Sequence, residues 1–244
     1  MENQQTTPLN DKKAAVGAMF DDIAHRYDFL NHFLSFGIDK IWRRKAVRII
    51  SRIQKNPDIL DVATGTGDLA IAAMKLDPSH ITGIDISEKM LEAGREKVLK
   101  LGLSAKIELL AGDSENILFP DKSFDVAMSA FGVRNFADPL AGLTEMGRVL
   151  RNGGLIMVLE FSRPSKFPFS QVYRFYFLNI LPFLGRIFSK NKRAYRYLPE
   201  TVMQFPENEK FIEMLIKAGF SDVKQERLTW GVASIYTGII YKTQ

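Results

Sequence analysis

The stretch that decides the fold is Ile59-Leu-Asp-Val-Ala-Thr-Gly-Thr-Gly-Asp-Leu-Ala70. It begins with a short apolar run typical of a buried strand, continues into a glycine-rich turn and ends in residues that favour a helix. Such a unit exposes backbone N–H groups at the helix N-terminus, where a ligand can bind. The sequence therefore predicts a ligand site around Gly65, Thr66 and Gly67.

Composition narrows the classes of protein. The 244 residues suffice for one large domain, and there is no cysteine, which excludes disulfides, thiolate metal sites and cysteine nucleophiles. We see no apolar leader at the N-terminus, and the longest apolar run, around residues 175–187, is shorter than the roughly 20 residues that span a bilayer. The three histidines have no metal-ligand spacing, so we expect no metal.

After the turn, short apolar segments alternate with amphipathic helical segments. The expected strands are 58–63, 81–85, 105–110, 124–129, 155–161, 223–229 and 232–241, and the expected helices between them are 68–76, 88–101, 139–150 and 208–218. Alternation of this kind predicts an α/β fold with a mostly parallel sheet covered on both faces. The short Trp230-Gly231 turn makes the last two strands antiparallel.

Two regions stand outside this alternation. We expect residues 1–10 to be a disordered tail before a single domain over 11–244, in which 11–56 forms an N-terminal helical cap of two helices. The basic side of the second helix, Arg43 to Arg48, is expected to face solvent. Residues 162–205 are expected to be a basic, aromatic helical insertion, because residues 161–199 contain no Asp or Glu but eight Lys or Arg and eleven aromatic residues.

Acidic residues around the turn indicate the ligand. Asp85 follows Gly65 by twenty residues, where a carboxylate can accept hydrogen bonds from both ribose hydroxyls of either NAD or S-adenosylmethionine. Asp61, Asp68 and Asp113 add further carboxylates nearby. A pyrophosphate would be repelled there, whereas a sulfonium and an ammonium supply the cationic partners that buried carboxylates need. We therefore expect S-adenosylmethionine.

Longer motifs resemble the UbiE/MenG family of quinone-biosynthesis C-methyltransferases. They are Phe20-Asp-x-Ile-Ala-x-Arg-Tyr-Asp28, Asn31-x-x-Leu-Ser-x-Gly37, Trp42-Arg43, Asp61-Val-Ala-x-Gly-Thr-Gly-Asp68, Ser129-x-Phe-Gly-Val-Arg-Asn135 and Leu159-Glu-Phe-Ser-x-Pro164. The resemblance covers about 13–242. It implies a class I S-adenosylmethionine-dependent methyltransferase, Rossmann-like, whose seven-stranded sheet has an antiparallel last strand. It also implies methylation of a ring carbon of a polyprenylated quinol: 2-demethylmenaquinol to menaquinol, or the ubiquinone counterpart.

The resemblance assigns roles to residues. The implied cofactor contacts, together with the residues of the turn, are Asp61, Gly65, Thr66, Gly67, Asp85, Asp113, Ser114 and Ser129. On the acceptor side we expect Arg134 to steady the quinol oxygen, Asn135 to orient it and Tyr27 to join a proton relay. Two alternatives stay open: Arg134 bound to a structural carboxylate such as Asp138, and Tyr27 as a core residue. His25 and Asp39 are weaker candidates for a base.

The expected partners follow from the same resemblance. A polyprenylated quinol is the substrate, the basic residues at 190–196 would contact an anionic membrane surface, and the protein would be cytoplasmic or peripheral on the inner face of the cell membrane. The 162–205 insertion would form a tunnel for the prenyl chain or only a helical cap. We expect no nucleic acid, and a homodimer stays open. Three other functions stay in view: a methyltransferase with another acceptor, an NAD-dependent oxidoreductase and a non-catalytic S-adenosylmethionine-binding module.

Overall fold

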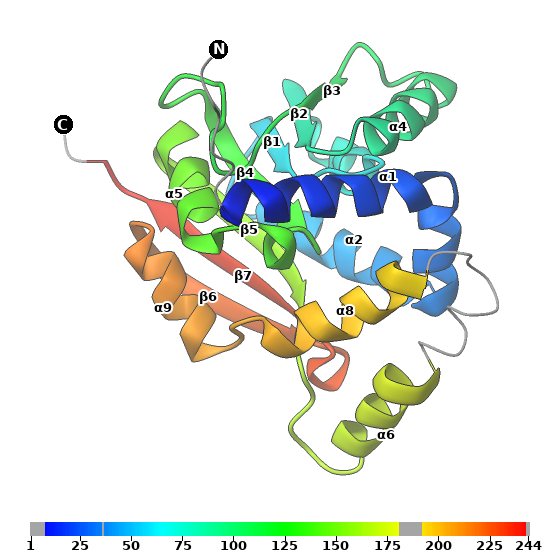
Figure 1. The fold of residues 1–244 in the computed structure, drawn as a ribbon. Coiled ribbons are helices and arrows are strands. Elements are labelled where there is room, and N and C mark those ends of the chain that lie inside the picture. Colours follow the sequence, from blue (N-terminus) through cyan, green and yellow to red (C-terminus); the bar gives the residue numbers. More distant parts are fainter. Residues whose placement is uncertain (1–7, 36, 181–191, 243–244) are drawn as a thin grey trace.

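A seven-stranded sheet forms the centre of the protein (Figure 1). The structure is a computed structural model that describes residues 8–35, 37–180 and 192–242, without the side chains of 8, 26–34, 177–178, 192–196 and 198. The strands are β1 Asp58–Val62, β2 His80–Asp85, β3 Ile107–Ala111, β4 Phe124–Ala130, β5 Leu150–Phe161, β6 Phe220–Leu228 and β7 Ala233–Ile240.

The sheet has the order β3-β2-β1-β4-β5-β7-β6. The first five strands pair in parallel, and β7 is antiparallel to both β5 and β6, which confirms the predicted fold. The chain moves outward from β1 to β3 and then returns to place β4 on the other side of β1. Ligands of parallel sheets bind at such a reversal, outside the carboxyl ends of the strands.

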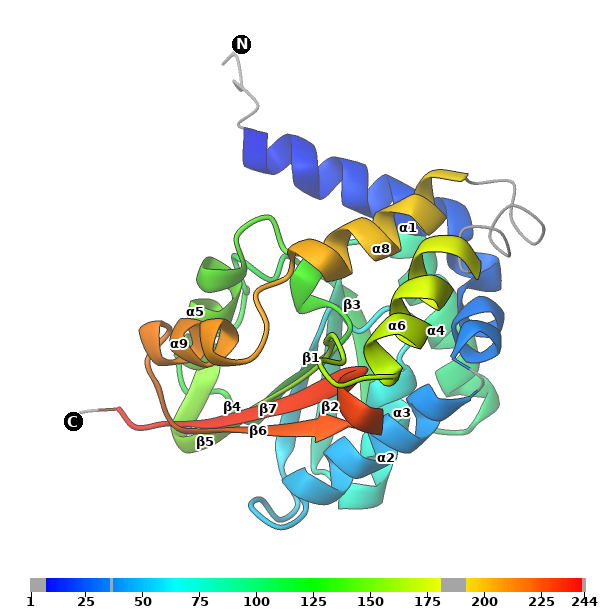
Figure 2. The ribbon, with the colours of Figure 1, turned by 90° about the horizontal axis from the view of Figure 1, so that it is seen from below.

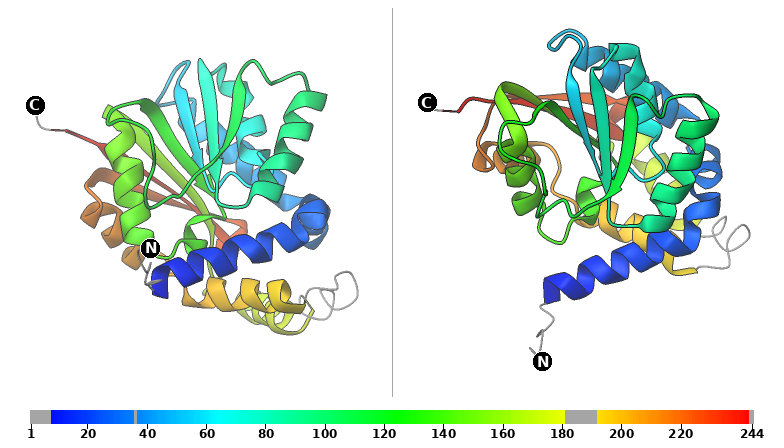
Figure 3. Two further views of the ribbon diagram at one scale, coloured as in Figure 1. Left: turned by 45° about the horizontal axis from the view of Figure 1, so that its top comes forward. Right: turned by 90° about the horizontal axis from the view of Figure 1, so that it is seen from above.

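Helices cover both faces of the sheet (Figure 3). One apolar core joins the sheet to α2 Ile38–Ile50, α3 Asp68–Ala73 and α4 Glu88–Lys100. The other joins it to α5 Pro139–Val149 and α9 Glu209–Lys217. The parallel strands β1, β2, β4 and β5 are therefore covered on both faces and read as nearly continuous apolar runs, whereas residues of the edge strand β3 alternate between buried and exposed.

Side chains fix where the helices begin. The Ser87 hydroxyl accepts a hydrogen bond from the Met90 N–H at the start of α4. Asp138 accepts hydrogen bonds from two N–H groups at the start of α5, where Pro139 has no N–H to satisfy. Asp138 is therefore a helix cap in this structure.

Three helices lie along the carboxyl edge of the sheet, where the views in Figures 2 and 3 place α1 beside α8. They are α1 Pro8–Leu34, α6 Phe169–Phe175, which continues as a π-helical turn to Ile180, and α8 Lys192–Gln204. Residues 8–10, expected in the tail, belong to α1, because a proline fits the first turn of a helix. Lys190 lies outside the described residues. No helix in the described part of the chain is long and apolar enough to cross a membrane.

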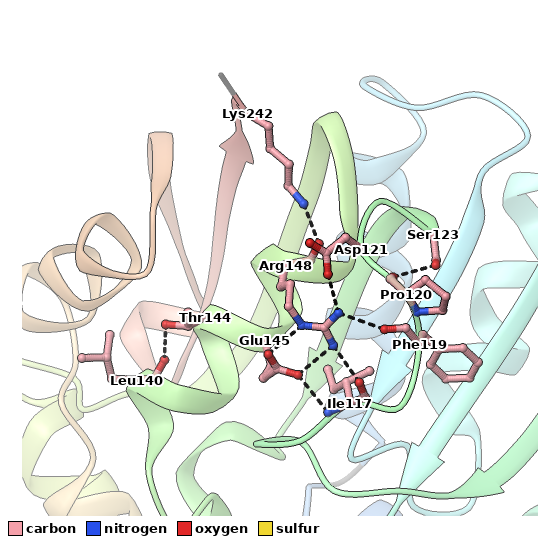
Figure 4. Close-up of polar contacts among 10 residues, drawn as sticks. All are labelled: Ile117, Phe119, Pro120, Asp121, Ser123, Leu140, Thr144, Glu145, Arg148 and Lys242. Atoms are coloured by element: carbon pink, nitrogen blue, oxygen red, sulfur yellow. Dashed lines mark hydrogen bonds and ion pairs between the residues drawn. The ribbon is translucent and has the colours of Figure 1, made fainter. Parts of the chain in front are cut away.

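Arg148 fastens the loop between β3 and β4 to α5 (Figure 4). Its guanidinium donates to the Glu145 and Asp121 carboxylates and to the carbonyls of Ile117 and Phe119, at distances of 2.7–2.9 Å. Glu145 also accepts a hydrogen bond from the Ile117 N–H. The loop that begins at Gly112 is thus held at its far end by one side chain.

Candidate functional site

A cavity opens at the carboxyl ends of β1, β2 and β4. Its volume, including the open mouth, is about 930 Å³. Seven of the predicted site residues line it: Asp61, Gly65, Thr66, Asp85, Asp113, Ser114 and Asn135. The lining does not include Gly67, Ser129 or Arg134.

The glycine turn has the conformation that its sequence predicts. Gly65 and Gly67 both have positive φ, 57° and 78°, which glycine adopts without steric cost. Ala63 also has a positive φ of 55°, at a cost of about 1 kcal/mol for a residue with a Cβ. A Cβ on Gly132 would lie only 2.6 Å from the Ala63 Cβ. Gly132 thus leaves the space that Ala63 needs.

Asp85 fixes the turn and faces the cavity. Its two carboxylate oxygens accept hydrogen bonds from the Gly65 N–H at 2.8 Å and the Ser87 N–H at 2.9 Å. Burial raises the pKa of Asp85 above its usual value, and these N–H groups oppose the shift. Because a carboxylate oxygen has two lone pairs, each keeps capacity for a further donor such as a ribose hydroxyl.

Asp61 is a buried carboxylate with unused hydrogen-bonding capacity. Its side chain is 1% exposed, and its Oδ2 accepts a hydrogen bond from the Thr64 hydroxyl at 2.7 Å. Its Oδ1 is buried and makes no hydrogen bond with the described residues. Burial raises the pKa of Asp61 to about 7. An ammonium in the cavity would satisfy this oxygen and favour the ionised form.

The expectation that all four acids await a cationic ligand is wrong for two of them. Asp68 Oδ1 lies 2.8 Å from Lys97 Nζ, and its Oδ2 lies 3.4 Å from Arg43. Asp113 Oδ2 lies 2.6 Å from Lys13 Nζ. Within the described chain, no Lys or Arg forms an ion pair with Asp61 or Asp85, so these two carboxylates are the ones that a cationic ligand can pair with.

Arg43 also corrects the expectation of a solvated basic face on α2. It is 8% exposed and pairs with Asp39, four residues earlier on the same helix. The Asp39 carboxylate also accepts a hydrogen bond from the Ser35 hydroxyl at 2.5 Å. Asp39 is therefore engaged in a buried ion pair.

Helix α1, expected as part of an N-terminal cap, closes the cavity with residues that were not predicted to line it. Lys13, Val16 and Phe20 line the cavity from this helix. Lys12 Nζ donates to the Phe136 carbonyl at 2.7 Å, and Asp21 accepts from the Ser87 hydroxyl at 2.6 Å. The apolar period of the helix indicated a buried face. It could not indicate that a cavity lies beneath that face.

On the acceptor side, Asn135 is the predicted residue that reaches the cavity. Its Nδ2 donates weakly to the Phe131 carbonyl at 3.4 Å, while its buried Oδ1 makes no hydrogen bond in the described structure. Ser129 on β4 is fully buried, and its hydroxyl finds no hydrogen-bond partner among the described residues. Tyr27 belongs to α1, in the part whose side chains are not described.

Arg134 forms a buried ion pair directly behind the cavity wall. Its Nη1 lies 3.0 Å from the Glu160 carboxylate, which is fully buried, and its backbone N–H donates to the same carboxylate at 3.2 Å. The structural partner is thus Glu160 and not Asp138. The guanidinium lies 5.3 Å from the centre of the Phe161 ring.

Three aromatic rings pack between Arg43 and Arg134. The Phe131 and Phe161 rings lie 4.6 Å apart, and Trp42 contacts both at about 6 Å. Phe131 itself lines the cavity. The cavity wall at Phe131 is therefore aromatic, with the Arg134 guanidinium on the far side of the Phe161 ring that packs against Phe131. No group of acidic or histidine side chains in the described part of the chain could hold a metal ion.

The profile of the ubiE/COQ5 methyltransferase family matches residues 6–240. A demethylmenaquinone methyltransferase of Bacteroides fragilis is 46% identical over 227 residues, which are 93% of this chain and 92% of that protein. A ubiquinone/menaquinone biosynthesis C-methyltransferase UbiE of Geotalea daltonii is 47% identical over 232 residues, 94% of this chain and 98% of that protein.

Solved structures share the fold at lower identity. A SAM-dependent methyltransferase from Aquifex aeolicus has a TM-score of 0.58 at 22% identity and covers 81% of this chain and 89% of its own. The [4+2]-cyclase SpnF has a TM-score of 0.68 at 17% identity and covers 93% of this chain and 96% of its own. Because one of these enzymes is named a cyclase, the fold alone does not fix the reaction.

Proposed function

Because the chain belongs to the ubiE/COQ5 methyltransferase family, we propose that it transfers a methyl group from S-adenosylmethionine to a ring carbon of 2-demethylmenaquinol, giving menaquinol. The observation that carries the choice of acceptor is the identity of 46% over 93% of the chain to a protein named demethylmenaquinone methyltransferase. The acceptor is a polyprenylated quinol, and the protein is an S-adenosylmethionine-dependent C-methyltransferase.

The cavity supports S-adenosylmethionine as the methyl donor. The cofactor, when bound, supplies an electrophilic methyl group on a sulfonium. Asp85 has free lone pairs for the ribose hydroxyls, and the unsatisfied Asp61 Oδ1 can accept from the ammonium of the methionine part. We propose that Thr66, Gly65 and Gly67 shape the floor, and that Asp113, Ser114 and Ser129 complete the adenosine side.

The acceptor side supports stabilisation of a phenolate. A quinol carbon becomes a better nucleophile when the neighbouring hydroxyl loses or shares its proton. We propose that the Asn135 Oδ1, which has no partner in the described structure, accepts from that hydroxyl. The Arg134 guanidinium lies just behind and stabilises the developing negative charge, while Glu160 fixes its position. Tyr27 is proposed to join the proton relay.

A second acceptor has a specific observation in its favour. Relatives of 45–47% identity carry the name ubiquinone/menaquinone biosynthesis C-methyltransferase. The same chemistry on the ubiquinone precursor is therefore the alternative function. Because both acceptors carry polyprenyl chains that reside in lipid, we further propose that the protein is cytoplasmic and works at the inner face of the cell membrane.

Quinone analysis of cells that lack the protein distinguishes these acceptors. We expect demethylmenaquinone to accumulate and menaquinone to disappear, with recovery on expression of the wild-type chain but not of Asp85→Ala. Accumulation of the unmethylated ubiquinone precursor alone would make the alternative the main function. An unchanged quinone profile would refute both.

A further inference from the structure

An exposed aromatic face lies at the end of the molecule formed by α6 and the turn between β6 and β7, beside each other in Figures 1 and 2. Four apolar side chains there are largely exposed: Phe167 at 79%, Trp230 at 70%, Val172 at 63% and Phe175 at 60%. We call these four residues the aromatic face. Single exposed apolar residues are ordinary, but a group of them marks an interaction site.

Specific contacts hold the two parts of the aromatic face together. The Trp230 indole stacks on Phe169 of α6, with ring centres 4.4 Å apart and an interplanar angle of 8°. The Arg227 guanidinium of β6 donates to the Arg163 carbonyl at 2.9 Å. Val172 and Phe175 are three residues apart on α6 and share one side of that helix. Trp230 therefore packs on α6, the helix that also exposes Val172 and Phe175.

The backbone presents Trp230 to solvent at a steric cost. Thr229 and Trp230 both have positive φ, 45° and 54°, a conformation that costs a residue with a side chain about 1 kcal/mol or more. Such a turn is ordinarily built with glycine or asparagine. A strained turn that exposes an indole suggests that the exposed indole itself has a role.

Positively charged side chains beside the aromatic face indicate which kind of partner it binds. Lys166 and Arg174 are exposed and stand directly next to Phe167 and Phe175 in the sequence. The sequence from 161 to 199 contains no acidic residue. An apolar centre with cations around it matches an anionic lipid surface, where Trp and Phe lie at the headgroup level and Lys and Arg meet phosphates.

We propose that the aromatic face docks the protein on an anionic phospholipid bilayer, with Trp230 and Phe175 inserted into the headgroup region. Beneath this face, Tyr173 and Tyr176 pack with Phe161 against Val202. Phe161 in turn contacts Phe131 in the cavity wall. The inner side of α6 therefore connects the bilayer to the acceptor side of the cavity, a route for a prenyl chain that rests on the proposed function.

Tryptophan fluorescence tests the docking directly. The chain has two tryptophans, and Trp42 is 5% exposed, so a change in emission on adding vesicles reports Trp230. With vesicles of phosphatidylglycerol and phosphatidylcholine we expect a blue shift, and quenching when the acyl chains are brominated. Trp230→Phe should bind the same vesicles without the quenching. Emission that stays unchanged in the wild type would overturn the proposal.

Sedimentation with the same vesicles tests the surface residues. Phe167→Ser with Phe175→Ser should lower the partition coefficient about tenfold or more, and Lys166→Gln with Arg174→Gln about fivefold per charge, with a loss of salt dependence. The matched control is Leu99→Ser with Leu118→Ser, 70% and 82% exposed elsewhere. An equal loss in the control would contradict the assignment.

Two further outcomes separate this proposal from others. If the serine variants change the oligomeric state in analytical ultracentrifugation and leave vesicle binding unchanged, the aromatic face covers a second copy of the chain and the proposal fails. The vesicle assays contain neither cofactor nor acceptor. Loss of docking and loss of methyl transfer are therefore separate results, and either can fail alone.

Discussion

Replacing Asp61 with asparagine should abolish most of the pH dependence of S-adenosylmethionine binding between about pH 6 and pH 7. In the wild type, burial raises the pKa of Asp61 to about 7, and the proposed ion pair with the ammonium needs the ionised form. About one-eleventh of the carboxyl is ionised at pH 6 and about one-half at pH 7. The affinity of the wild type should therefore rise about fivefold across this unit of pH.

The raised pKa of Asp61 should also make the free energy of unfolding of the cofactor-free protein depend on pH. The unfolded carboxyl has its ordinary pKa of 3.8, so the cofactor-free protein takes up a proton on folding between about pH 4 and pH 7. Asp61 therefore makes its full contribution to the free energy of unfolding below about pH 4. This contribution decreases as the pH rises to about 7, and above that pH it no longer changes. Asp61→Asn should flatten this part of the stability profile.

Calorimetric titration at each pH, in two buffers of different ionisation enthalpy, measures both affinity and proton release. The wild type should release nearly one proton per cofactor at about pH 6, and Asp61→Asn should release less. At about pH 8 the variant should bind about 1.5–3 kcal/mol more weakly, the value of a charged hydrogen bond. A wild-type affinity that does not change with pH, or an equal slope in the variant, would show that Asp61 does not pair with the ammonium of the cofactor.

Three further predictions concern the framework of the site. Asp85→Ala should lose detectable cofactor binding in calorimetry, because it removes the acceptor for the Gly65 N–H as well as the proposed ribose acceptor; micromolar binding would contradict this. Arg134→Ala leaves Glu160 buried without a cation and should lower the free energy of unfolding by about 3–5 kcal/mol in urea titrations. Adding Glu160→Gln should restore stability but not methyl transfer. Restored turnover would remove Arg134 from the mechanism. Arg148→Ala should lower the free energy of unfolding by about 1–3 kcal/mol in thermal denaturation, and an unchanged midpoint would show that the contacts in Figure 4 contribute little.

The sheet could be predicted because the sequence patterns that indicate each strand and helix lie within a few neighbouring residues. Apolar runs separated by amphipathic helices fix the order of elements, and the short turn after β6 fixes the antiparallel pair. The ends of elements were less predictable. Strand β5 begins at Leu150, ahead of the expected 155–161, because Leu150 already pairs with Phe124 of β4 and Gly154 pairs with Ile240 of β7. The second pairing depends on a strand more than eighty residues further along the chain.

The glycine turn of the site could also be predicted from neighbouring residues. The basic residues that pair with its acidic side chains could not. The glycine turn and Asp85 could be placed from spacing, whereas Lys13 reaches Asp113 across 100 residues and only the packing of α1 brings them together. One distant pair did have a signal. Glu160 stands in the apolar run 155–161, and a buried carboxylate requires a cation. We did not use that signal and considered Asp138 as the structural partner of Arg134, whereas the structure shows Glu160.

Transfer of a methyl group to a quinol carbon can be followed directly with the purified chain. The purified chain is incubated with S-adenosylmethionine bearing a deuterated methyl group and with reduced demethylmenaquinone in phosphatidylglycerol vesicles, and the quinones are analysed by mass spectrometry. We expect menaquinone with the intact deuterated methyl group on its ring, absent with Asp85→Ala. Unmodified demethylmenaquinone, recovered while the wild type still binds the cofactor, would contradict it.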